Sequence, residues 1–204
     1  GHAIVFHDYH LDRLTGESGP VRERTAAELS QIRLRGSGDA KLTLTEVLAE
    51  IDGAVPVLIE IKDQSLIYGP IDGVLEQSVA EALKPYSGPT AVMSFNPHVT
   101  QAMAEYAPGI PRGLVTERFT WLNVSDRGTR ARMNAIADFE PTGSSFISHD
   151  VRDLPNRRVA EIRSAGHAVL CWTVRSARKE ARVRPLVDNI TFEGYLPQAA
   201  GPGG

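Results

Sequence analysis

The sequence predicts an α/β fold around a parallel sheet, with chemically active side chains at the carboxyl ends of its strands. Six short apolar runs bounded by turn residues alternate with stretches in which apolar residues recur at helical spacing, a pattern typical of parallel sheets. Glu60, Lys62, Ser94 and Trp172 lie at the ends of such runs, where barrel enzymes assemble their sites. No glycine-rich phosphate loop follows a run, which disfavours a nucleotide-binding sheet.

The expected strands are short, and their apolar composition indicates that they are buried. They occupy residues 55–61, 90–95, 112–115, 144–148, 168–174 and 188–192. Six strands are an awkward number, because an eight-stranded barrel requires two more.

Helices are expected between the strands and ahead of the first one. Thr25 opens a capping-box helix that runs to about Leu34, and Thr43 opens a second helix. Apolar spacing predicts further helices within residues 71–83, 99–106 and 159–165. Gly166 stops the last of these, and Pro155 stands near its start as a first-turn proline would.

Less regular segments separate these elements. Residues 16–20 are expected to form a turn, and residues 116–143 an irregular loop followed by one helix. We expect one barrel domain over residues 1–198 and a flexible tail of small residues, glycine and proline at 199–204.

Composition limits the partners of the protein. With 204 residues and 42% hydrophobic side chains, the chain can bury the core of one domain. A formal charge of −3 gives no overall attraction to nucleic acid or anionic membranes, so a polyanion would need a local basic site. The lone Cys171 is expected to be buried, and no apolar stretch approaches the roughly 18 residues of a membrane span. We therefore expect a cytoplasmic protein with no nucleic acid partner and no integral membrane segment.

His7 is the candidate catalytic residue. It ends the apolar run of residues 3–8 beside Asp8, and this run indicates a strand end. An imidazole titrates near neutral pH and Asp8 can fix its tautomer, so His7 can act as a general acid or base. The alternative is a surface or capping histidine beside a turn-forming aspartate. Structural roles are expected for the other isolated histidines, His2, His10, His98 and His167.

Glu60 and Lys62 form the most specific pair of candidate site residues, because residues i and i+2 of a strand share one face. Opposite charges within a run of valine, leucine and isoleucine are costly to bury unless they meet each other, a metal or an ionic ligand. Carboxylate oxygen suits a hard divalent cation, and an ammonium group suits phosphate. We expect a functional pair, the alternative being a structural ion pair across a barrel interior.

Later strand ends carry weaker candidates. Ser94 lacks the G-x-S-x-G elbow, so we do not assign it as a nucleophile. Trp172 can form an apolar wall of a ligand site and still donate one hydrogen bond. His149 with Asp150 is equally compatible with a loop cap and with a ligand contact.

Taken together, these stretches resemble the glycerophosphodiester phosphodiesterases, a family of metal-dependent (β/α)8 TIM barrels. The matching stretches include V-F-H-D at residues 5–8, L-I-E-I-K at 58–62 and S-F-N at 94–96. Others lie at residues 9–15, 19–21, 43–48, 166, 169–174 and 187–191. They follow the order of the family from residue 3 to about residue 197, and this ordered set is more specific than any one member.

The resemblance implies that the expected strands are the third to eighth of the barrel. Members of the family begin with a strand carrying a His-Arg pair and a strand carrying Glu-x-Asp, and only then reach the V-x-H-D segment. This chain starts after both, so we expect strands 1 and 2 to be missing from it. The 204 residues alone are then expected to fold poorly, bind metal weakly and turn over little substrate.

The resemblance also implies roles for the candidate residues. His7 is the second of two acid/base histidines, and Glu60 is one of three carboxylates around a divalent cation, Mg²⁺ or Ca²⁺. Lys62 contacts the phosphate, and Trp172 lines the substrate groove. The implied reaction is hydrolysis of a glycerophosphodiester to sn-glycerol 3-phosphate and an alcohol.

Other functions stay open at this point. One is a related barrel phosphodiesterase of phospholipase D or sphingomyelinase type, and another is a non-catalytic barrel that binds a phosphate-bearing ligand. Assembly into a homo-oligomer is also left open.

Overall fold

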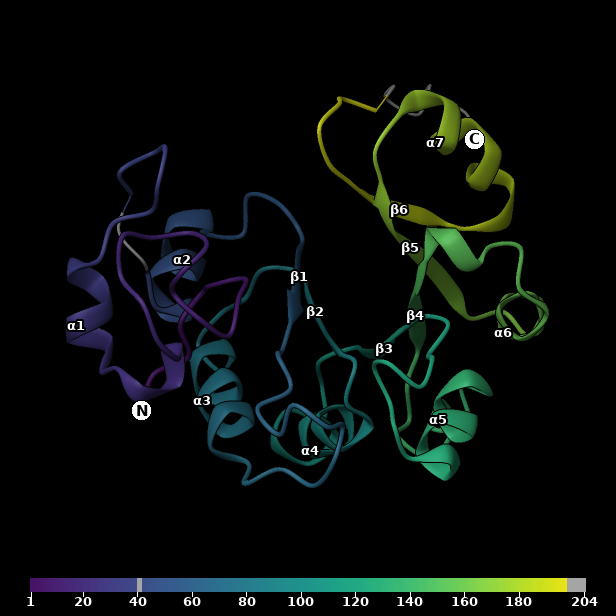
Figure 1. Ribbon diagram of the computed structural model, residues 1–204, viewed down its shortest axis with the longest axis horizontal. Helices are drawn as coiled ribbons and strands as arrows, with labels where there is room; N and C mark the ends of the chain where they lie inside the picture. The colour runs from purple at the N-terminus through teal and green to yellow at the C-terminus, as the bar shows by residue number, and fades with distance from the viewer. Residues whose placement is uncertain (40–41, 198–204) are drawn as a thin grey trace. The chain divides into compact units, whose positions relative to one another are not determined.

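The computed structural model describes residues 1–39 and 42–197 (Figure 1). The chain divides into two compact units. The first comprises residues 1–57 and 72–90, and the second comprises residues 58–71 and the chain from Ala91 onward. Each unit buries apolar side chains of its own.

The first unit contains η1 (Val21–Glu23), α1 (Ala26–Gln31), α2 (Leu44–Ile51) and α3 (Val74–Leu83). The expected capping box of α1 is confirmed, because Thr25 accepts the backbone N–H of Glu28 while the glutamate side chain accepts that of Thr25. Thr43 and Glu46 form the same arrangement at α2. An N-cap of this kind stabilises a helix by about 1 kcal/mol.

α1 ends earlier than the sequence indicates. Gln31 is its last residue, and the backbone of Ile32 is already extended. Leu34, the expected end, instead pairs with the buried Thr15 in an isolated antiparallel bridge. Pairing with a distant segment therefore replaces the last helical turn.

The indication that the apolar run of residues 3–8 ends a strand is wrong. Ile4 forms only an isolated bridge with Thr43. The N–H of Val5 donates to the Leu42 carbonyl at 3.0 Å, and the N–H of Leu44 donates to the Ala3 carbonyl at 2.8 Å. The run thus forms backbone hydrogen bonds with the start of α2 instead of joining the sheet.

Strands of the described residues form one sheet in sequential order. They are β1 (Val57–Glu60), β2 (Thr90–Ser94), β3 (Arg112–Thr116), β4 (Phe146–Asp150), β5 (Ala168–Val174) and β6 (Asn189–Phe192). Every neighbouring pair from β2 to β6 is parallel. This is the order of consecutive strands in a (β/α)8 barrel, and it confirms the α/β fold with its parallel sheet.

The expectation that all strands are buried is wrong for β1 and β6. Leu58 in β1 is 39% exposed and Phe192 in β6 is 45% exposed. These strands are the edges of the sheet, so each lacks a neighbouring strand on one side. β4 is buried throughout, but it lies at residues 146–150 and not at the expected 144–148.

Helices of the second unit are α4 (Pro97–Tyr106), α5 (Arg127–Asn134), α6 (Arg157–Ser164) and α7 (Ala177–Val183), with the short η2 (Val151–Asp153) and η3 (Arg184–Leu186). The helix expected within residues 116–143 is α5. A buried core joins Val159 and Ile162 of α6 to Ile147 and Val169 of the sheet. Cys171 belongs to this core and is buried, as expected.

The ends of α6 differ in how well the sequence predicts them. Pro155 is not a first-turn proline, because Asn156 is the N-cap and accepts the backbone N–H groups of Arg158 and Val159. Gly166 stops the helix as predicted. Its φ of +91° is one that residues with a Cβ rarely adopt.

α7 was not among the expected helices. Val183 is its only large apolar side chain, so no apolar residues recur at helical spacing within it.

The expected single domain and the two further strands stay predictions, and the expected tail at residues 199–204 lies outside the described residues. Within the described ranges, no helix is both long and apolar enough to cross a bilayer.

Candidate active site

One face of the sheet carries polar side chains at the carboxyl ends of its strands. The register sets Thr116 of β3 beside His149 of β4, and Asp150 of β4 beside Trp172 of β5. Successive residues of a strand alternate between faces. Glu117 therefore lies with Asp150 and Trp172 on one face, which we name the Trp172 face, and Thr116 with His149 lies on the other.

The predicted pair Glu60 and Lys62 stands at the carboxyl end of β1. The Lys62 ammonium donates to Oε1 of Glu60 at 2.7 Å. The side chains of Lys62 and Glu60 are 24% and 26% exposed, so the ion pair is partly shielded and still within reach of a ligand. The two side chains thus meet each other, and their role toward phosphate or metal stays a prediction.

Buried hydrogen bonds fix the backbone next to this ion pair. Ser94 Oγ donates to the carbonyl of Ile61 at 2.7 Å. Asn96 Nδ2 donates at 2.8 Å to Oδ1 of Asp63 and at 2.8 Å to the carbonyl of Gly69. Because the Ser94 hydroxyl is committed to a backbone carbonyl and wholly buried, it is not placed to attack a substrate.

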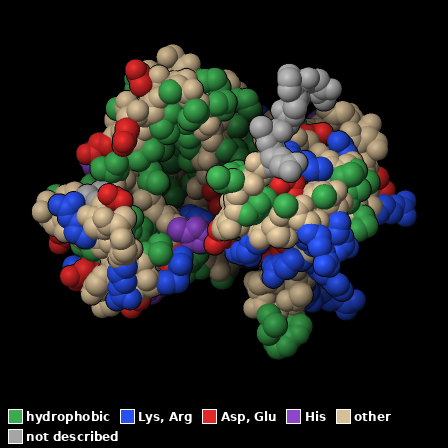
Figure 2. All heavy atoms as spheres, turned by 90° about the horizontal axis from the view of Figure 1, so that it is seen from above, with side chains coloured by type: hydrophobic (Ala, Val, Ile, Leu, Met, Phe, Trp, Pro, Cys, Tyr) green, Lys and Arg blue, Asp and Glu red, His purple; other side chains and the backbone are tan. Residues whose placement is uncertain are grey.

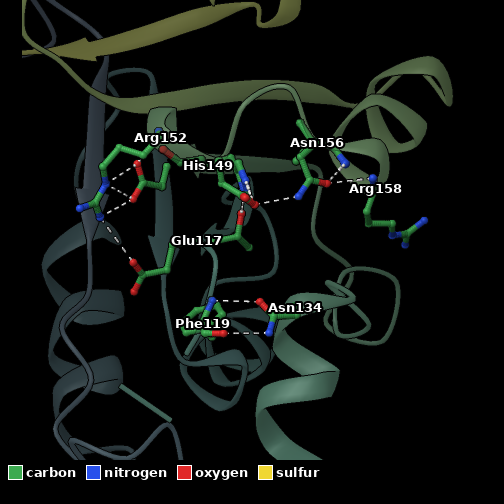
Figure 3. A network of polar contacts seen from close by, with 12 residues as sticks. Glu117, Phe119, Asn134, His149, Arg152, Asn156 and Arg158 are labelled. Atoms are coloured by element: carbon green, nitrogen blue, oxygen red, sulfur yellow. Dashed lines mark hydrogen bonds and ion pairs between the residues drawn. The ribbon is translucent and has the colours of Figure 1, made fainter. Parts of the chain in front are cut away.

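A charged cluster of Glu117, Asp150 and Arg152 lies at the ends of β3 and β4 (Figure 3), and neither Glu117 nor Arg152 was expected there. Arg152 donates through Nε and Nη2 to the Asp150 carboxylate at 2.5 to 3.1 Å. Nη2 of the same guanidinium lies 3.8 Å from Oε2 of Glu117. Asp150 and Arg152 are two residues apart, a spacing that could have indicated the pair. Glu117 joins them only through the register of β3 and β4.

The two carboxyl groups of this cluster titrate differently. Burial raises the pKa of Glu117, the negative charge of Asp150 raises it further, and Arg152 opposes both effects. Burial also disfavours the ionised form of Asp150, but the hydrogen bonds and charge of Arg152 outweigh it and lower the pKa of Asp150. Carboxyl groups whose pKa values are pushed apart in this way are frequent in catalytic sites.

His149 lies on the opposite face and is only 2% exposed. Its Nδ1 lies 2.8 Å from the Thr116 hydroxyl, and its Nε2 lies 3.2 Å from Oδ2 of Asp153. Asn156 donates to the same Asp153 oxygen at 2.8 Å. Burial lowers the pKa of His149, against the opposing effect of Asp153. These contacts tie β3 and β4 to the start of α6 and favour the loop-cap interpretation.

Trp172 is partly buried, and two contacts hold its ring. Nε1 donates to the carbonyl of Ser148 at 3.0 Å, and the ring packs edge-on against Phe95 with centroids 5.5 Å apart. The indole donor is thereby used by the protein, and a role of Trp172 toward a ligand stays a prediction. Among the described residues, the buried Ser148 hydroxyl has no hydrogen-bond partner.

His7 belongs to the first unit, where its side chain is 74% exposed. Its Nδ1 lies 2.7 Å from Oδ1 of Asp8. Arg13 donates to both oxygens of that carboxylate, at 2.6 and 2.7 Å, and this hydrogen bonding lowers the pKa of Asp8 to about 2. An ionised Asp8 can thus orient the imidazole of His7, as the sequence indicates.

The predicted residues fall in both units. His7 lies in the first, while Glu60, Lys62 and Trp172 lie in the second. Across residues 1–39 and 42–197, no group of three or more His, Cys, Asp or Glu side chains is placed to hold a metal ion. Glu60 is also occupied by Lys62.

Relatives are found along nearly the whole chain. The sequence matches the glycerophosphoryl diester phosphodiesterase family over residues 1–190. YhdW of Bacillus subtilis, whose name places it among the glycerophosphodiester phosphodiesterases, is 26% identical over 200 residues, covering 93% of this chain and 76% of YhdW. The glycerophosphodiester phosphodiesterase of Caldanaerobacter subterraneus subsp. tengcongensis is 31% identical over 124 residues, covering 56% of this chain and 49% of that protein.

Solved structures share the fold. A phosphodiesterase of Oleispira antarctica, determined in complex with the product sn-glycerol-3-phosphate, has a TM-score of 0.70 and 20% identity over 93% of this chain and 74% of that one. The glycerophosphodiester phosphodiesterase of Thermotoga maritima has a TM-score of 0.67 and 18% identity over 94% of this chain and 76% of that one. Because the family match extends over residues 1–190, the chain belongs to the glycerophosphoryl diester phosphodiesterase family, a family of phosphoric diester hydrolases.

Proposed function

We propose that the protein hydrolyses glycerophosphodiesters to sn-glycerol 3-phosphate and an alcohol. The family match over residues 1–190 carries this proposal. The partly exposed ammonium of Lys62 at the carboxyl end of β1 supports it, because such a group can bind a phosphodiester. The Oleispira antarctica enzyme binds sn-glycerol-3-phosphate, the product that this reaction requires.

Two side chains act on the reacting groups. Lys62 stabilises the negative charge that develops on the phosphoryl oxygens. His7, oriented by Asp8, takes a proton from the attacking hydroxyl or gives one to the leaving alkoxide. The attacking group is either water or the glycerol hydroxyl of the substrate. Trp172 forms an apolar wall beside the bound diester.

Glu60 would serve as one ligand of a divalent cation, Mg²⁺ or Ca²⁺. When bound, such an ion neutralises phosphate charge. The steps above are assigned to side chains alone.

A hydrolysis assay on the natural gene product that contains these residues tests the proposal. Glycerophosphocholine and sphingomyelin are supplied in separate reactions with Mg²⁺ or Ca²⁺. Release of sn-glycerol 3-phosphate is measured with the first substrate, and release of phosphocholine or ceramide phosphate with the second. Release of sn-glycerol 3-phosphate from glycerophosphocholine is expected. Preferential cleavage of sphingomyelin would reassign the substrate. Binding of glycerophosphocholine without hydrolysis, unchanged by His7→Ala, would indicate a non-catalytic barrel.

A further inference from the structure

The loop between β3 and α5 holds two large apolar side chains in solvent. Trp121 is 71% exposed and Leu122 is 77% exposed. They are adjacent in the chain, and we name them the Trp121 tip. Single exposed apolar residues are common on protein surfaces, but an adjacent tryptophan and leucine at the end of a loop form a combined apolar projection.

Hydrogen bonds on both sides of the tip define its conformation. The backbone N–H of Val124 donates to the carbonyl of Thr120 at 2.9 Å, and that of Thr120 donates to Oδ1 of Asn123 at 2.6 Å. These bonds close a turn around the tip. Asn134 of α5 clamps Phe119 through two further hydrogen bonds of 2.9 and 3.0 Å (Figure 3).

Apolar anchors flank the turn. Phe119 on one side and Val124 on the other are buried with Met133 of α5, and Tyr68 and Phe95 pack against this cluster. The loop therefore buries the apolar residues before and after the tip, while the side chains of Trp121 and Leu122 are exposed. A turn held between two buried anchors thus presents these two side chains to solvent.

Arginines flank the tip along the chain, and the carboxylate of Glu117 accepts a hydrogen bond from Asn123 of the turn at 3.2 Å. Residues 118–132 contain four arginines and a single acidic residue, Asp126. Asp126 accepts the backbone N–H of Thr129 as the N-cap of α5. Arg118 and Arg127 are exposed. Figure 2 shows one face of the molecule, on which Lys and Arg side chains gather in several places.

We propose that the Trp121 tip docks onto an anionic phospholipid surface. Tryptophan with an aliphatic neighbour suits the boundary between acyl chains and headgroups, and arginines beside it suit anionic headgroups. Two side chains are too small to form the roughly 1,000 Å² of a stable protein interface. The whole chain carries a charge of −3, so attraction to such a surface has to be local.

Vesicle co-sedimentation tests this without any catalytic readout. The natural gene product is mixed with vesicles of phosphatidylglycerol and phosphatidylcholine, or of phosphatidylcholine alone. The wild type is expected to bind the anionic vesicles, with a blue shift of tryptophan emission, and to be released by about 0.5 M salt. The double variant Trp121→Ala/Leu122→Ala should lower vesicle affinity about tenfold or more.

Matched variants separate the contribution of the apolar tip from that of the arginines. Arg118→Gln/Arg127→Gln should weaken binding to anionic vesicles about tenfold and remove most of the salt dependence. Leu196→Ala, which changes a leucine that is 89% exposed outside the tip, should bind like the wild type. Circular dichroism establishes that each variant is folded.

Several outcomes would overturn the proposal. These are no binding of the wild type to anionic vesicles, or equal binding by the wild type and the Trp121→Ala/Leu122→Ala variant. A dimer that depends on Trp121 would assign the tip to a second copy of the chain. A raised KM for soluble glycerophosphocholine, without vesicle binding, would place the tip in the substrate site.

Discussion

Lys62 and Glu60 are joined through Nζ and Oε1 at 2.7 Å, and about three-quarters of each side chain is shielded from solvent. A partly exposed ion pair of this kind contributes little to stability, about 1 kcal/mol or less. A phosphate or a cation that enters the site has to compete with this contact. The pair therefore holds the ammonium and carboxylate in position and leaves each available to a stronger partner.

Removing the Lys62 charge should lower catalysis far more than stability. Lys62→Met is expected to reduce kcat on glycerophosphocholine by about 10² to 10³, the usual effect of losing one group that stabilises developing charge. Its free energy of unfolding should fall by about 1 kcal/mol or less. Steady-state kinetics and urea denaturation measure the two effects. Lys84→Met, at the exposed C-cap of α3, is the control.

A purely structural pair would give another pattern. The double variant Glu60→Gln/Lys62→Met would then regain the activity of the wild type, because neither charge remains unpaired. If the two residues act on phosphate and cation, the double variant stays inactive, and Glu60→Gln alone raises the Mg²⁺ or Ca²⁺ concentration needed for half-maximal activity.

His7 should be required for proton transfer. His7→Gln is expected to lower kcat by about 10² to 10⁴ with little change in stability, because the side chain is 74% exposed. The control is His10→Gln, which alters another exposed histidine three positions along. Equal activity of the two variants would remove His7 from the mechanism.

Local sequence patterns predict elements well when the decisive contacts are local. The capping box at Thr25 and the stop at Gly166 depend on a few adjacent residues, and both are found. The end of α1 is not predicted, because pairing of Leu34 with Thr15 opposes the helix from outside it. α7 contains one large apolar residue, so its sequence shows no helical periodicity of apolar residues.

In the candidate site too, contacts between residues close in sequence are predicted and contacts between distant residues are not. Glu60 and Lys62 are predicted as neighbours from the i and i+2 spacing of a strand, and they form an ion pair. The approach of Glu117 to Arg152 depends on the register between β3 and β4, which no local pattern indicates. The apolar run of residues 3–8 does not end a strand for a related reason, since its backbone partners lie at the start of α2.

His149 should make stability depend on pH below neutrality. Burial lowers its pKa in the folded state, so below about 6.5, the usual histidine pKa, the unfolded chain binds the proton more readily. Stability is then expected to fall as pH drops from about 7 toward 5. Urea denaturation across this range should show a smaller pH slope for His149→Gln than for the wild type, even though the variant is less stable overall. Parallel slopes would contradict the buried neutral imidazole.

The pKa of Glu117 should respond in opposite directions to changes at its two charged neighbours. Asp150 raises this pKa and Arg152 lowers it, on top of the increase due to burial. Asp150→Asn should therefore lower the pKa of Glu117, and Arg152→Gln should raise it. Carboxyl carbon NMR titration of selectively labelled glutamate measures both shifts, with Glu140, an exposed residue paired to Arg158, as an internal control. A shift in the same direction for both variants would mean that altered burial, and not the charge of the cluster, controls Glu117.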